Sequence, residues 1–99
     1  MNNVNILGLN YDIEEVPYIN RDEFRLGEIN YIEQKIRIDE ALTDDKKNVV
    51  LLHEIIHGIC EGLGLDDECY SETFVQSFAT ALYQCFKNNE FLWIGGKKS

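Results

Sequence analysis

The sequence predicts a small α+β domain: a mostly antiparallel sheet, then two helices packed against one another and against one face of the sheet. Two observations carry this prediction. Apolar residues alternate with polar ones up to about residue 40, as in strands with one packed face and one wet face. Further along, apolar residues recur at helical spacing. Because the strands precede the helices without alternating with them, we expect an α+β and not an α/β architecture.

Four short strands are predicted, because β-branched and aromatic residues alternate with polar ones in four places. They are Val4–Gly8, Ile13–Ile19, Leu26–Ile32 and Lys35–Ile38. Pro17 interrupts the second segment, which suits an edge strand or the end of a strand. Glu33 and Gln34 separate the last two segments at hairpin spacing, with a turn type that the sequence leaves open.

The first helix is predicted to begin at Thr43 as N-cap, because Asp44 and Asp45 then lie in its first turn, where the helix dipole favours negative charge. It should end at Gly62 or Gly64.

A second helix should run from about Asp67 or Ser71 to about Asn88, with either Asp66 or Ser71 as its N-cap. The segment FLWI, residues 91–94, is predicted to be a last strand or a packed tail.

Composition narrows the function classes. The chain has 99 residues, of which 44% are hydrophobic, so we expect one domain over residues 1–94 and a flexible basic tail over 95–99. Lys plus Arg is 9 and Asp plus Glu is 18, giving a net charge of −9, which is unfavourable for binding nucleic acid. No apolar run approaches the roughly 18 residues of a membrane span, and the N-terminus does not resemble a signal peptide. With three cysteines, an odd number, we expect a cytoplasmic protein with three thiols.

Residues His53-Glu54-Ile55-Ile56-His57 form an H-E-x-x-H motif inside the first predicted helix. The two histidines are four residues apart, so both imidazoles can reach one Zn²⁺ from the same helix face. Glu54 projects to a different side, where it can act as a general base on a zinc-bound water. The chain contains only two histidines, and both belong to the motif.

A catalytic zinc site needs a third protein ligand, which cannot be a histidine here. Glu72 is the preferred candidate, because it lies at the edge of the apolar face of the second helix. Glu68 is the alternative, followed by Asp67. Cys60 lies on nearly the same face as His53, but three turns of one helix rarely converge on one tetrahedral ion, so we expect it to pack in the core.

The segments LLHEIIHGICEGLG and SETFVQSFATALYQ resemble the small gluzincin-type metallopeptidases of the ImmA/IrrE group, in the short form carried by phages and mobile elements. The resemblance covers residues 25–87. It implies that His53, His57 and Glu72 bind zinc and that Glu54 is the catalytic base. Longer members of the group carry a preceding helix and sometimes a sensing domain, neither of which we expect in this chain.

These features predict a zinc metalloendopeptidase that acts on a protein or peptide substrate. Lys35–Asp39 is the expected strand for pairing with an extended substrate. Tyr70, Tyr83 or a main-chain N–H is the expected stabiliser of the oxyanion. Two alternatives remain: a catalytically inactive, zinc-binding pseudo-peptidase, and an acidic inhibitor or binding protein of a mobile element.

Overall fold

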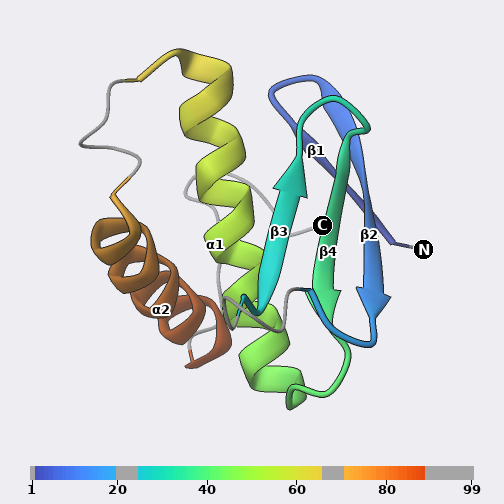
Figure 1. The fold of residues 1–99 in the computed structure, drawn as a ribbon. Helices are drawn as coiled ribbons and strands as arrows, with labels where there is room; N and C mark the ends of the chain where they lie inside the picture. The colour runs from blue at the N-terminus through green and yellow to red at the C-terminus, as the bar shows by residue number, and fades with distance from the viewer. Residues whose placement is uncertain (1, 20–24, 66–70, 89–99) are drawn as a thin grey trace, which may run out of the picture.

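The computed structural model describes residues 2–19, 25–65 and 71–88. Four strands precede two helices, which confirms the predicted α+β class (Figure 1). The elements are β1 (Asn3–Ile6), β2 (Leu9–Val16), β3 (Gly27–Asn30), β4 (Lys35–Asp39), α1 (Asp44–Leu63) and α2 (Glu72–Asn88).

The sheet has the order β1-β2-β4-β3. β1 pairs with β2 and β3 pairs with β4 in antiparallel fashion, while β2 and β4 are parallel. The sheet is therefore mixed, with two of its three pairings antiparallel. The sequence did not reveal the parallel pair, because side-chain alternation gives no information on which strands become neighbours.

In the first hairpin, the boundaries of both strands differ from the predicted ones. Leu7 and Gly8 both have positive φ, 53° and 94°, and form the two-residue turn between β1 and β2 that the sequence had placed inside a strand. β2 then ends at Val16, directly before Pro17, whose ring nitrogen has no hydrogen to donate to a neighbouring strand.

The predicted second hairpin, between β3 and β4, is confirmed. Its loop is longer than two residues, because β3 ends at Asn30. The side-chain Oδ1 of Asn30 accepts hydrogen bonds from the backbone N–H groups of Ile32 (3.0 Å) and Glu33 (2.8 Å). These two local hydrogen bonds take the place of strand pairing and turn the chain toward β4.

Both helix starts follow the capping chemistry of the sequence. Thr43 Oγ1 accepts from the Lys46 N–H at 3.2 Å, and Ser71 Oγ accepts from the Phe74 N–H at 3.2 Å, so Ser71 and not Asp66 precedes α2. α1 ends at Gly64, which adopts the left-handed conformation with φ 66°. The expectations for residues 67–70 and 91–94 lie outside the described residues.

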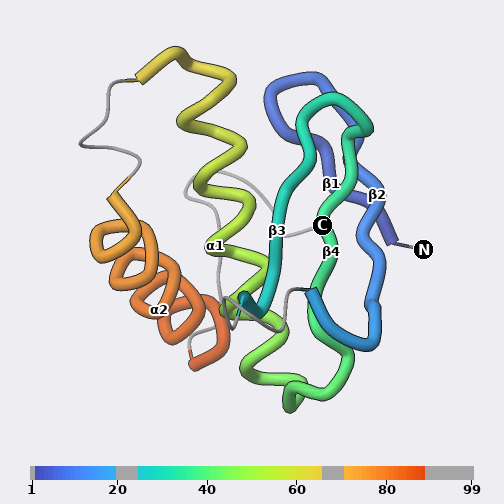
Figure 2. The backbone as a smooth tube through the Cα atoms, viewed as in Figure 1, coloured from blue at the N-terminus to red at the C-terminus, as the bar shows by residue number. Residues whose placement is uncertain are grey.

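α1 lies between the sheet and α2, so the fold has three layers (Figures 1 and 2). One side of α1 completes a core with the sheet, and the other side packs on α2. The sheet-side core consists of Ile6, Tyr11, Ile36, Ile38 and Val50, and the α2-side core of Ile56, Cys60, Val75 and Ala79. Among the described elements α2 contacts only α1. The expectation that both helices cover the sheet is therefore wrong for α2, because α1 is apolar on two sides.

The predicted burial of Cys60 is confirmed, since its side chain is 2% exposed. The expectation of three thiols is wrong, because Cys60 is disulfide-bonded. An odd number of cysteines excludes a complete disulfide framework but leaves room for one pair. Cys85 is an exposed thiol and Cys69 lies outside the described residues. Neither described helix is long and apolar enough to cross a membrane.

Candidate metal centre

One turn of α1 carries His53 and His57 on a common face. Their ring centroids are 4.9 Å apart, and both side chains are largely buried, at 14% and 13% exposure. This is the arrangement that the four-residue spacing predicts, because residues four apart in a helix are neighbours.

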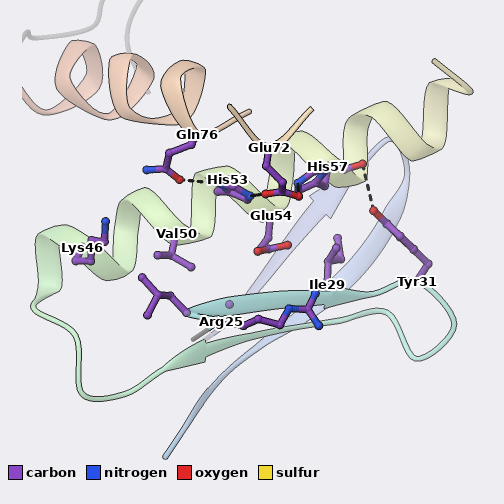
Figure 3. Close-up of a pocket in the computed structure, with 12 residues that line it drawn as sticks. Arg25, Ile29, Tyr31, Lys46, Val50, His53, Glu54, His57, Glu72 and Gln76 are labelled. Atoms are coloured by element: carbon purple, nitrogen blue, oxygen red, sulfur yellow. Dashed lines mark hydrogen bonds and ion pairs between the residues drawn. The ribbon is translucent and has the colours of Figure 1, made fainter. Parts of the chain in front are cut away.

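Glu72, the first residue of α2, reaches across to both imidazoles (Figure 3). Its Oε1 lies 2.8 Å from His53 Nε2, and its Oε2 lies 3.1 Å from His57 Nε2. The three potential ligand atoms all lie within 4.8 Å of one another. The structure thus brings together His53, His57 and Glu72, whereas Asp67 and Glu68 lie outside the described residues.

Packing between the helices explains this placement. Val75 and Ala79 of α2 are fully buried against Ile56 and Cys60 of α1. Glu72 lies one turn before Val75 on α2, so the contact between the two helices holds it over the histidine pair. Its own side chain is 75% exposed, at the solvent side of the site.

Hydrogen bonds from α2 determine the tautomer of His53. Thr80 Oγ1 donates to the Gln76 carbonyl at 2.8 Å, so the hydroxyl oxygen remains to accept from Gln76 Nε2 at 3.3 Å. The Gln76 amide oxygen therefore faces His53 Nδ1, at 2.8 Å, and accepts a hydrogen bond from it. With a proton on Nδ1 donated to Gln76, the His53 ring presents Nε2 toward Glu72.

This arrangement suits a cation. The Nε2 lone pair of His53 faces a carboxylate oxygen at 2.8 Å, and two acceptors are held that close only by a positive charge. The charge can be a proton or a metal ion. Burial lowers the pKa of His57, although Glu72 opposes this effect, so protonation is disfavoured on that ring. Two imidazole nitrogens and one carboxylate are also the donor set of known catalytic zinc sites.

Gln76 is a residue that the sequence analysis missed, although its position four residues after Glu72 on the same helix was a usable signal.

Replacing Gln76 with leucine should lower zinc affinity about 10- to 100-fold, because His53 loses the acceptor that orients its ring. Gln76→Glu should retain the affinity, because a carboxylate also accepts from Nδ1. The measurement is competition with a chromophoric zinc chelator, with the exposed Gln84→Leu in the same helix as control. Equal affinities for wild type and Gln76→Leu would contradict this role.

Glu54 is buried, at 7% exposure, against the start of β3. A Cβ atom at Gly27 would lie 2.5 Å from Val50 Cγ1 and 3.4 Å from Glu54 Oε2, so the absent side chain lets the strand come close to α1. Burial raises the pKa of Glu54 to about 7. The charge of His53 opposes this shift, the charge of Glu72 adds to it, and Arg25 opposes it.

The raised pKa of Glu54 predicts how stability depends on pH in the metal-free protein. A carboxyl group with a folded pKa of about 7, against an ordinary value of 4.5, binds its proton more tightly in the folded state. The protonated Glu54 carboxyl group therefore contributes its full stabilisation below about pH 4.5, and this contribution is lost as the pH rises through about 7. We therefore expect the free energy of unfolding of wild type, measured with denaturant in the presence of a chelator, to fall by about 3 kcal/mol relative to that of Glu54→Gln between pH 5 and pH 8. A difference that stays constant with pH would contradict the burial of an ionisable Glu54.

The site opens into a cleft of about 510 Å³ between the helices and β3. Its lining includes the four predicted site residues, His53, Glu54, His57 and Glu72. It also includes residues to which the sequence analysis gave no role at the site, among them Arg25, Gly27, Ile29, Tyr31 and Lys46. Among the described strands, β3 lies at the edge of the sheet beside this cleft, and β4 lies between β2 and β3. Lys35–Asp39 is therefore not the strand that borders the cleft, because both of its edges are already paired.

Tyr83 was expected as one possible oxyanion stabiliser, and the structure contradicts this. Its hydroxyl donates to Asp45 Oδ1 at 2.6 Å, outside the lining of the cleft. Tyr31 lines the cleft instead, and its hydroxyl donates to the main-chain oxygen of His57 at 3.4 Å. Tyr70 lies outside the described residues.

Searches against protein-family models, curated proteins and solved structures give no significant match to this chain. The geometry and chemistry of the site itself therefore give the main indication of function.

Proposed function

We propose that this protein is a zinc-dependent metallopeptidase that hydrolyses peptide bonds of a protein substrate, as the resemblance to the ImmA/IrrE group implies. One observation carries the proposal. His53, His57 and Glu72 converge within 4.8 Å, beside a buried carboxylate, Glu54, on the wall of the same cleft. A histidine pair that served packing alone would need neither the facing carboxylate nor the adjacent buried acid.

In this proposal His53, His57 and Glu72 hold the metal and Glu54 moves the proton. Zn²⁺ bound there supplies Lewis acidity, which polarises the substrate carbonyl and makes water a stronger acid. Glu54 accepts the proton of the attacking water at a carboxylate oxygen and then delivers it to the leaving amine. Its low exposure keeps bulk water away from this transfer.

An extended peptide is the substrate form that suits the edge of β3. The Leu26 carbonyl accepts from the Asp39 N–H at 3.0 Å, so alternate residues from Leu26 onward bond to β4. The intervening residues, Gly27 and Ile29, direct their N–H and C=O groups away from β4, and both line the cleft. A peptide bonded to these groups would lie along the site as an added strand.

A cleavage assay tests the proposal. Zinc-loaded protein is incubated with an unfolded protein and with a fluorescence-quenched peptide library, and new termini are identified by mass spectrometry. We expect specific cleavage that a chelator abolishes and added zinc restores. A protein that holds zinc but produces no new termini would be a pseudo-peptidase, and one that binds no zinc would support the acidic binding protein.

A further inference from the structure

The cleft differs in charge from the rest of the chain. The whole sequence carries −9, whereas the cleft is lined by two carboxylates, Glu54 and Glu72, and by two cations, Arg25 and Lys46. When both carboxylates are ionised and both imidazoles are neutral, the charges of the lining residues cancel. A bound Zn²⁺ would therefore give the cleft a net positive charge. Such a cleft in an otherwise acidic surface concentrates anionic groups at one place.

Lys46 is one of the two cations that line the cleft, and Arg25, the other, pairs with Glu28 at 4.0 Å. Each of the other described lysines forms an ion pair with a carboxylate, whereas Lys46 has no such partner among the described residues. The pairs are Lys35 with Glu14, Lys47 with Glu15 and Lys87 with Asp45. Lys46 also lies in the first turn of α1, where the helix dipole disfavours a positive charge. Lys46 is exposed, so its ammonium group is accessible to a ligand in the cleft.

The direction of α1 and β3 places Lys46 relative to the histidines. Gly27 lies against Val50 and Glu54, and Ile29 lies against Gly58, so the strand and the helix run the same way along the cleft. Lys46 lies two helical turns before His53, about 10 Å along the axis. Figure 3 shows Lys46 toward the start of α1 and Tyr31 at the other end of the site, with His53 and Glu54 between them. The Arg25 guanidinium lies beneath Glu54 and beside Ile29 in the same view, not at the Lys46 end.

We propose that the cleft selects a peptide with a carboxylate two or three residues beyond the scissile bond, on its C-terminal side, and that Lys46 binds this carboxylate. The inference rests on the proposed peptidase function. An extended peptide rises about 3.3 Å per residue, so about 10 Å corresponds to three residues, and the length of the lysine side chain allows two. A peptide antiparallel to β3, the more stable pairing, directs its C-terminal side toward Lys46.

The test uses fluorescence-quenched peptides with Glu, Gln or Lys fixed at one position at a time, each with either an amidated or a free C-terminus. Wild type should cleave peptides with Glu at the second or third position after the scissile bond about fivefold faster than those with Gln, and more slowly still with Lys. Lys46→Gln should remove the preference and Lys46→Glu should reverse it. Lys47→Gln and Lys47→Glu are matched controls, because Lys47 lies next in the chain but pairs with Glu15 outside the cleft. The preference should weaken at high salt.

The outcomes separate this inference from the function on which it rests. Cleavage that is indifferent to charge at every position, or equal in wild type and Lys46→Glu, would overturn the inference and leave the peptidase intact. A preference for Glu before the scissile bond would overturn the assigned direction. A preference that only free C-termini satisfy would assign the site to a terminal carboxylate and overturn the side-chain assignment. Absence of cleavage of any peptide by the zinc-loaded protein would overturn both proposals.

Discussion

Replacing Glu54 with glutamine is expected to reduce peptide hydrolysis about 10²- to 10⁴-fold while leaving zinc content unchanged. Glutamine has nearly the same shape and still forms a hydrogen bond to water, but it cannot accept a proton. The loss corresponds to about 3–5 kcal/mol of transition-state stabilisation. The measurement is kcat/KM on the best peptide of the library, with zinc content determined on the same samples.

Folding of the Glu54→Gln variant must be checked, because Glu54 is buried. Glutamine removes a carboxyl group whose pKa burial raises to about 7, so the metal-free variant should be at least as stable as wild type at neutral pH. An inactive variant that is also unfolded would therefore not count in favour of the mechanism. A folded, zinc-bound variant that cleaves as fast as wild type would contradict the role of Glu54 as general base.

Replacing Glu72 with alanine should instead weaken metal binding itself. Glu72 contributes both oxygens that face the histidines, at 2.8 Å and 3.1 Å, so its loss leaves two ligands for the ion. At zinc concentrations about 1,000 times the dissociation constant, metal binding stabilises the folded state by about 4 kcal/mol, and most of this stabilisation should disappear. Glu72→Gln should behave in the same way, because an amide oxygen is a poorer zinc ligand than a carboxylate.

The measurement for Glu72 is the shift of Tm on adding zinc to the metal-free protein. Wild type should show a large upward shift and both Glu72 variants a small one. Glu61→Ala, which removes an exposed carboxylate of α1 that belongs to neither the metal cluster nor the cleft lining, serves as control and should shift like wild type. An equal shift in wild type and Glu72→Ala would show that the third ligand is a different residue.

Local patterns in the sequence predicted the parts of the site that depend on one helix. The spacing of His53 and His57 fixes their common face, and Thr43 fixes the start of their helix. The position of Glu72 followed from the apolar face of the second helix, because that face must pack on the first. Each of these inferences uses contacts within one helix or between helices adjacent in sequence.

The parts that the sequence did not predict depend on pairing between distant segments. The parallel pairing of β2 with β4 makes β3 the edge strand at the cleft, and alternation within a strand cannot specify this order. The same limit applies to Arg25 and Lys46, which line one cleft although they are far apart in the sequence. The separation of α2 from the sheet follows from the two apolar sides of α1, one of which packs on the sheet and the other on α2.

The central claim is that His53, His57 and Glu72 bind one zinc ion, and metal analysis of the purified protein tests it most directly. Native mass spectrometry, with elemental analysis of the same sample, should find one zinc per chain in wild type and in Glu54→Gln. The double variant His53→Ala/His57→Ala should retain none. Stoichiometric zinc in the double variant, or a wild-type chain that binds no zinc at micromolar concentrations, would contradict the account.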